Sequence, residues 1–252
     1  MINLMRSLSC FFTAALLLSS CGGGDTKPEA KKEAPPLDPT AIGTITGKVT
    51  FSGEKPASRP INMDAVPACA NQHKGELPPQ DMVVGKGGEL KNVFVYVKAG
   101  LPARQWPTPS TPVEINQKGC LFAPRVLGIM VGQELVFTND DPTMHNIHPT
   151  PKNNREWNSS QAPKGEKIVK KFDKEDVMIP FKCNVHPWMR ANVGVLAHPY
   201  FAVTSDDGSF FLKDLPAGEY TLEAWHEKLG TQEIKVSVAA KETRSAEIAF
   251  KK

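Results

Sequence analysis

Residues 206–222 read DDGSFFLKDLPAGEYTL, and this stretch decides the fold class. An Asp-Gly turn signal at 207–208 precedes one short aromatic and aliphatic run, and a Pro-Ala-Gly signal at 216–218 precedes the next. Short runs of this kind, bounded by Gly and Pro, are typical of strands. The sequence therefore predicts strands over 209–212 and 220–225.

The same pattern continues on both sides of this stretch. Strands are expected over 234–238 and 246–250, after a Leu-Gly turn signal at 229–230. Near the N-terminal side, residues 43–51 alternate between apolar and polar, and residues 93–97 read VFVYV, which is apolar on both faces. Residues 55–91 are rich in Pro and Gly and irregular. With no long amphipathic helix, the chain is predicted to be all-β.

Composition agrees with a folded domain and excludes one class of function. Of 252 residues, 40% are hydrophobic and 23% are charged, which is enough apolar surface for a core. The net charge is only +3, with both signs interspersed along the chain. A dedicated nucleic-acid surface needs clustered positive charge, so nucleic-acid binding is not expected.

The motif at 206–222, together with the strand at 43–50, resembles the carboxypeptidase regulatory-like domain, a small transthyretin-like or prealbumin-like β-sandwich. In this chain the opening and closing strands lie far apart. We therefore expect a discontinuous sandwich built from residues 43–100 and 199–252, with a second domain inserted in it or preceding it at 108–198. The resemblance implies a fold and no peptidase activity, since no zinc-peptidase motif is present.

The inserted region carries residues that bind metals. The run CNVHPWM at 183–189 places a thiol, an imidazole and a thioether at intervals of three, and His145 follows an expected strand at 133–139. Two imidazoles with a soft thiolate and a weak thioether favour copper. Zinc more often takes four strong ligands, and Met is a poor one.

Residues 113–196 resemble the cupredoxins, and amicyanin and its plastocyanin-like relatives most of all. The resemblance rests on CNVHPWMR at 183–190, on Met-His-Asn at 144–146, and on the flanking strands 131–137 and 192–195. It implies a Greek-key β-sandwich with one type 1 (blue) copper. It also implies roles for five residues: His145, Cys183 and His186 as equatorial ligands, Met189 as the axial ligand, and Asn146 as the link between the two ligand loops. Pro187 either packs the loop or, because proline restricts φ, stiffens the ligand turn.

Some residues near this motif leave alternatives open. His148 could reach the metal in place of His145, although His145 occupies the motif position. By the same resemblance His186 would lie at the surface in an apolar patch, and Trp188 would either enlarge that patch for docking of a partner or simply be partly exposed. The long stretch 149–171 between the ligand loops departs from the family pattern.

The five cysteines can each be assigned a role. Cys10 lies in the signal peptide expected at residues 1–20, Cys21 is the expected lipidation site, and Cys183 is the expected copper ligand. Cys69 and Cys120 therefore remain as a pair that could form a disulfide. In the loop-entropy model such a bridge stabilises by about 3 to 5 kcal/mol. The competing idea, a second metal site at Cys69 and His73, lacks further nearby ligands. His198 and His226 read as ordinary surface or core histidines.

The N-terminus predicts export and anchoring. Residues 1–20 contain a short cationic segment and an apolar run, which are typical of a secretory signal. The tetrapeptide LSSC at 18–21 resembles a bacterial lipobox, which implies lipidation of Cys21 and a membrane-anchored protein on the periplasmic side or the cell surface. Residues 21–42, rich in Gly, Pro, Lys and Glu, are expected to form a flexible linker.

These features predict a membrane-tethered one-electron carrier that cycles Cu(I) and Cu(II) between redox proteins, without a small-molecule substrate. The chain contains none of the common hydrolase, haem or phosphate-binding motifs, so an enzyme is not expected. Two other functions remain open at this stage: delivery of copper by a copper-handling lipoprotein, and a surface-binding module whose metal site is not used for redox chemistry.

Overall fold

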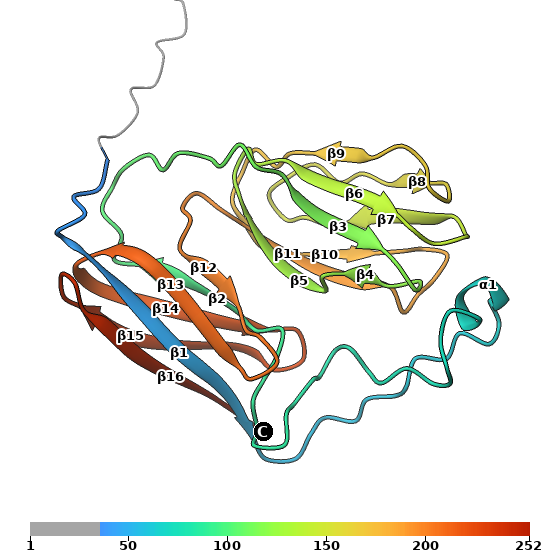
Figure 1. Ribbon diagram of the computed structural model, residues 1–252, viewed down its shortest axis with the longest axis horizontal. Coiled ribbons are helices and arrows are strands. Elements are labelled where there is room, and N and C mark those ends of the chain that lie inside the picture. The colour runs from blue at the N-terminus through green and yellow to red at the C-terminus, as the bar shows by residue number, and fades with distance from the viewer. Residues whose placement is uncertain (1–35) are drawn as a thin grey trace, which may run out of the picture. The chain divides into compact units, whose positions relative to one another are not determined.

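The structure is a computed structural model that describes residues 36–252. Sixteen strands and one helix of four residues make up its regular elements (Figure 1). The all-β prediction is confirmed. The strands form four sheets, which pair into two sandwiches.

The first sandwich combines strands from both ends of the described chain. One sheet has the order β13-β1-β16 and the other β12-β2-β14-β15. Strand β1 lies in the middle of its sheet, antiparallel to β13 and parallel to β16, so the N-terminal strand is held between two C-terminal ones. The bounds are β1 (Ile42–Ser52), β2 (Phe94–Ala99), β12 (Phe201–Val203), β13 (Ser209–Pro216), β14 (Gly218–His226), β15 (Gly230–Val238) and β16 (Thr243–Lys251).

Segment 93–97 is apolar on both faces because it faces two cores. Val93, Val95 and Val97 point into the core of the first sandwich. Phe94 and Tyr96 belong to a separate small core that also contains Val126 and Leu196. Since side chains alternate along a strand, a two-faced strand needs apolar residues at every position.

The second sandwich is built from residues 113–196. Its sheets have the orders β4-β3-β6-β9 and β5-β11-β10-β7-β8. The long stretch 149–171, which departs from the family pattern in the sequence, contributes one short strand to each sheet, β8 and β9. Both are edge strands, so the stretch adds to the edges of the sandwich. The bounds are β3 (Val113–Gln117), β4 (Phe122–Ala123), β5 (Val126–Met130), β6 (Leu135–Asn139), β7 (His145–Pro149), β8 (Ser159–Gln161), β9 (Ile168–Lys170), β10 (Asp176–Lys182) and β11 (Arg190–Leu196).

Residues 53–93, the excursion between β1 and β2, run from the first sandwich to the second and back (Figure 1). They contain helix α1 (Pro67–Ala70), which begins with a proline. A disulfide joins Cys69 at α1 to Cys120 of the second sandwich. Met63 and Cys69 are buried in the same core cluster as Ile115 and Phe137, so the excursion is packed against the second sandwich.

A pair of glycines makes room for Phe94 between the two sandwiches. Gly194 of β11 lies opposite Gly128 of β5, and a Cβ at Gly194 would lie 2.4 Å from the ring of the fully buried Phe94. Replacement of Gly194 by Ala should lower the free energy of unfolding by about 1 to 3 kcal/mol, because the ring has to shift within a filled core. Urea denaturation measures the change. The control is Gly218→Ala, where the nearest atom is at an ordinary 3.4 Å and stability should stay equal or rise slightly. Equal stability of Gly194→Ala and wild type would contradict the expectation.

A buried histidine in the first sandwich makes stability depend on pH. His226 is 1% exposed, and burial lowers its pKa from 6.5 to about 4. Between these values the unfolded chain binds a proton that the folded protein excludes, so the free energy of unfolding falls as the pH falls. The difference corresponds to about 3 kcal/mol at most. Urea denaturation at pH 7 and 4.5 tests this, with His226→Asn as the comparison. The Asn variant should lose part of the pH dependence, and an unchanged slope would contradict the assignment.

Candidate metal centre

Two loops of the second sandwich meet at one end of a strand pair. Strands β7 and β10 are antiparallel, with Lys182 opposite His148. His145 is the first residue of β7, and Cys183 directly follows the last residue of β10. Continued by one pair, this register places Cys183 opposite Ile147, two residues from His145 on the same face of the strand, so the pairing brings the two side chains close together.

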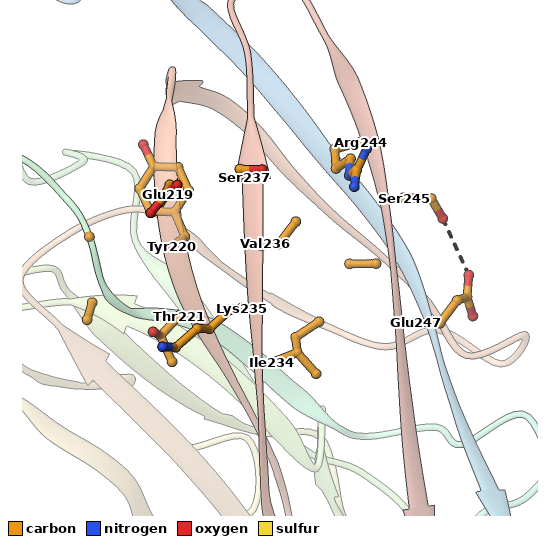
Figure 2. Close-up of a pocket in the computed structure, with 13 residues that line it drawn as sticks. Glu219, Tyr220, Thr221, Ile234, Lys235, Val236, Ser237, Arg244, Ser245 and Glu247 are labelled. Atoms are coloured by element: carbon orange, nitrogen blue, oxygen red, sulfur yellow. Dashed lines mark hydrogen bonds between the residues drawn. The ribbon is translucent and has the colours of Figure 1, made fainter.

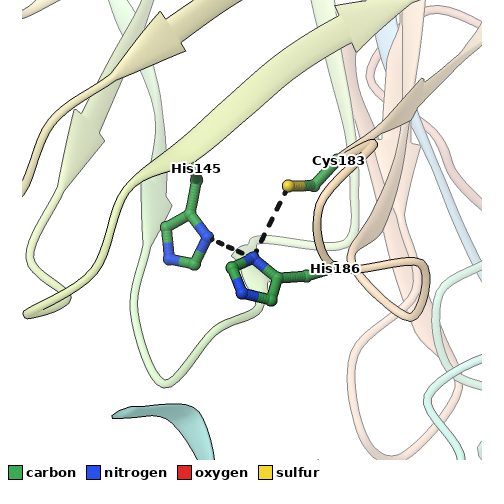
Figure 3. Close-up of side chains that lie close together, drawn as sticks. All are labelled: His145, Cys183 and His186. Atoms are coloured by element: carbon green, nitrogen blue, oxygen red, sulfur yellow. Dashed lines mark hydrogen bonds between the residues drawn. The ribbon is translucent and has the colours of Figure 1, made fainter. Parts of the chain in front are cut away.

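Three donor atoms converge at this point, which Figure 3 shows in close-up. The Nδ1 atoms of His145 and His186 are 2.8 Å apart, and the Cys183 Sγ lies 3.7 Å from the His186 Nδ1. All three donors lie within 4.8 Å of one another. The exposed fractions of the three residues are 0%, 2% and 1%, so bulk water is excluded. We call His145, Cys183 and His186 the donor triad.

The loop after β10 is closed by its own backbone. The amide of Cys183 donates to the carbonyl of Met189 at 3.2 Å, and the amide of Met189 donates to the carbonyl of His186 at 2.9 Å. Pro187 lies inside this turn, where its ring restricts φ. Met189 is fully buried in the same core cluster as Cys183. The loop thus holds a thiol, an imidazole and a thioether in a compact turn.

Asn146 joins the two ligand loops. Its side-chain Oδ1 accepts the amide of Asn184 at 2.7 Å and lies 3.3 Å from the Cys183 Sγ. Its own amide donates to that sulfur at 3.5 Å, and its Nδ2 donates to Asn158 at 2.7 Å. A single buried side chain therefore connects β7, the loop after β10 and the segment before β8.

The electrostatics of the triad differ from residue to residue. Burial raises the pKa of the Cys183 thiol, but hydrogen bonds from His145 and from backbone amides outweigh this and leave it below the ordinary value. Burial lowers the pKa of His145, yet Asp141 and Cys183 raise it above 6.5 overall. Burial lowers the pKa of His186, and the neighbouring His145 lowers it further. The environment thus shifts the titration of Cys183 toward the thiolate and that of His186 toward the neutral imidazole.

Other residues singled out in the sequence have different surroundings. His148 uses both ring nitrogens elsewhere, with Asn184 at 3.1 Å and Glu156 at 2.6 Å, so it is not part of the triad. Cys69 is in the disulfide with Cys120, and His73 contacts the carbonyl of Gly119 at 2.7 Å.

The prediction that His186 lies at the surface is wrong. His186 is 1% exposed. Its ring contacts the rings of His145 and Trp188, at centroid distances of 4.7 and 5.3 Å. Trp188 is half-buried and donates from Nε1 to the carbonyl of Cys120 at 3.0 Å. The indole that the sequence suggested for partner docking thus covers the imidazole and is fixed to the disulfide-bonded part of the chain.

One residue that contacts the triad was not identified from the sequence. Asp141 is fully buried, and its carboxylate lies 2.7 Å from the Nε2 of His145. Asp141 lies four positions before His145, which was the only indication in the sequence that the two residues are close. This spacing does not show that the carboxylate of Asp141 points into the core.

A groove lies on the first sandwich, away from the triad. It has a volume of 720 Å³ and runs along β14, β15 and β16, and Figure 2 shows its lining. The lining mixes charges of both signs, Lys235 and Arg244 with Glu219 and Glu247. It contains no cluster of metal-binding side chains within the described part of the chain.

The predictions for residues 1–20 and for the lipidated Cys21, together with most of the linker 21–42, lie outside the described residues. Within residues 36–252, no helix has the length and apolar character needed to cross a membrane.

Comparisons with known proteins give partial matches. The sequence profile of the ER membrane protein complex subunit 7 beta-sandwich domain matches residues 186–250, about a quarter of the chain. No curated protein matches the chain.

Among solved structures, a purple cupredoxin from Nitrosopumilus maritimus is 26% identical over 32% of this chain and 97% of its own, with a TM-score of 0.28. A Cu(I) amicyanin variant is 15% identical over 40% of this chain and 97% of its own, with a TM-score of 0.30. A copper-containing nitrite reductase from Thermus scotoductus SA-01 is 22% identical over 37% of this chain, with a TM-score of 0.31. The chain spans a quarter of that reductase.

The bridging role of Asn146 can be tested without a metal. Asn146→Ala removes the acceptor of the partly buried Asn184 amide and the donor to Asn158. The free energy of unfolding should fall by about 1 to 3 kcal/mol, because polar groups are left unpaired. Urea denaturation measures it, with Asn184→Ala as a control that keeps the backbone amide and Asn146 in place. A loss no larger than that of the control would show that Asn146 does not link the loops.

Proposed function

We propose that this protein is a copper protein that carries single electrons through one type 1 site formed by the donor triad and Met189. The observation that supports it best is the convergence of two imidazole nitrogens and one thiol sulfur in a buried position. When bound, copper would supply the one-electron couple between Cu(I) and Cu(II).

The donors fit copper better than the other common metals. A soft thiolate and thioether select copper, and imidazole suits both of its oxidation states. Hard cations such as Mg²⁺ and Ca²⁺ require oxygen ligands, and the triad offers none. Structural zinc sites take four strong ligands, whereas here Met189 would have to be the fourth.

The residues around the donors would serve electron transfer. Asn146 and the closed turn 183–189 hold the donors in fixed positions, and burial keeps water away from them. Electron transfer benefits from such rigidity, because the ligands then move little when the charge changes. With four protein donors no position is left for a substrate, so we propose a carrier and no enzyme.

The carrier would work outside the cytoplasm with redox proteins as partners. A signal at 1–20 and lipidation of Cys21 would anchor it to a membrane, with residues 21–42 as the tether. A disulfide between Cys69 and Cys120 suits an oxidising compartment. Trp188 would be the contact from the buried His186 toward a partner, because it is half-buried and touches the imidazole.

Copper titration of the purified chain tests the proposal. Wild type should show an intense thiolate-to-copper absorption band and the narrow copper hyperfine splitting of a type 1 site in electron paramagnetic resonance. Cys183→Ser should abolish both, since the charge-transfer band needs the thiolate. His148→Gln is the matched control, because His148 lies outside the triad, and it should keep the band. A colourless wild-type protein, or ordinary tetragonal copper, would refute an electron-transfer role.

A further inference from the structure

Asp141 is a buried carboxylate whose oxygens are fully engaged. Its Oδ1 accepts the amide of Gly119 at 2.6 Å, and its Oδ2 accepts the amide of Cys120 at 2.8 Å. The same Oδ2 lies 2.7 Å from the Nε2 of His145. An ionised carboxylate only accepts hydrogen bonds, so its three partners must all be donors.

This arrangement selects one tautomer of His145. Because Nε2 faces the carboxylate, it carries the proton, and Nδ1 is the nitrogen that offers a lone pair. That Nδ1 is the atom that faces His186 in the donor triad. The orientation of the ring and the donor atom it presents therefore both follow from Asp141.

The carboxylate depends in turn on an unusual backbone turn. Residues 118–121 form what we call the disulfide turn, in which Gly119 and Cys120 both have positive φ, 66° and 53°. A left-handed backbone is uncommon for a residue other than Gly, and here it directs two consecutive amides at Asp141. The excursion holds this turn by the Cys69–Cys120 bond and by the contact of His73 with the Gly119 carbonyl.

The disulfide turn also touches the other histidine of the triad. The carbonyl of Cys120 accepts the indole Nε1 of Trp188, whose ring contacts that of His186. One turn thus contacts His145 through Asp141 and His186 through Trp188.

We propose that Asp141 is the positioning residue of the donor triad and that the disulfide turn holds its carboxylate in place. The inference rests on the proposed function, since it assigns ligand orientation at that same site. The carboxylate keeps the proton on Nε2 of His145 and aims Nδ1 at the other two donors. The Cys69–Cys120 bond lies 25 positions before His145 in the sequence at its Cys120 end, and it reaches the triad through this contact and through Trp188. The Sγ of Cys120 also lies within 4.8 Å of a ring nitrogen of His145.

Asp141→Asn tests the role, because an amide can no longer accept all three donors. In the metal-free protein, at a pH where the His145 ring is neutral, the ¹⁵N chemical shifts of the ring should show loss of the Nε2-protonated tautomer. The affinity for Cu(I), measured by competition with bicinchoninate, should fall about 10- to 100-fold, as is usual when the partner of a ligating histidine is removed.

Asp176→Asn is the matched control. Asp176 is also a buried carboxylate of the second sandwich that accepts two consecutive amides, those of Lys152 and Asn153 at 2.9 and 2.7 Å. It lies at the opposite end of β10 from Cys183. Its variant should lose stability but keep the tautomer and the affinity. An equal effect of both variants, or wild-type behaviour of Asp141→Asn, would overturn the proposal.

A second variant tests the disulfide turn with Asp141 intact. The double change Cys69→Ala and Cys120→Ala should weaken Cu(I) binding about tenfold and broaden the His145 ring signals. If the Cu(I) affinity and the His145 tautomer were both unchanged, the proposed role of the disulfide turn would be refuted. The two readouts also separate the proposals: a wild-type chain that binds no Cu(I) refutes the copper function, whereas the metal-free tautomer still decides whether Asp141 orients His145.

Discussion

The antiparallel pairing of β10 with β7 is the constraint on which the candidate site depends. Lys182 at the end of β10 lies opposite His148, so the next residue, Cys183, lies beside the first half of β7 and close to His145. The pairing of β10 with β11 then forces the chain to return within the turn 183–189, where His186 and Met189 lie. Two registers thus gather the three donors, which lie up to 41 positions apart in the sequence, and Met189 lies in the same turn.

The same logic explains which parts were predictable from sequence. The strands at the C-terminus and the ligand turn are local features, set by turn residues and by short spacings within one segment. The strand 93–97 was correctly expected to be buried on both sides, but its second partner, the glycine pair Gly128 and Gly194, was not visible, because it depends on packing between two sandwiches.

The burial of His186 and the inward direction of Asp141 could not be predicted from the sequence, because both depend on contacts between distant segments. The ring of the buried His186 contacts Trp188, whose indole donates to the carbonyl of Cys120, and Cys120 is bonded to Cys69, 51 positions earlier in the sequence. The inward direction of Asp141 results from the positive φ angles at Gly119 and Cys120, which local propensity does not predict for a cysteine. The family resemblance therefore predicted an exposed histidine, whereas the structure buries it among side chains that include His145 and Trp188.

Hydrogen bonds near the triad shift the titration of two acidic groups. Cys183 and Asp141 both have pKa values lowered below their ordinary range, because hydrogen bonds to His145 and to backbone amides outweigh the effect of burial. A buried carboxylate is stable only when its partners compensate for its charge. Asp141 has three such partners, which are the amides of Gly119 and Cys120 and the Nε2 of His145. The contact that orients His145 is therefore also one of the contacts that keep the carboxylate stable in the core, so the orientation of the ring and the burial of Asp141 depend on each other.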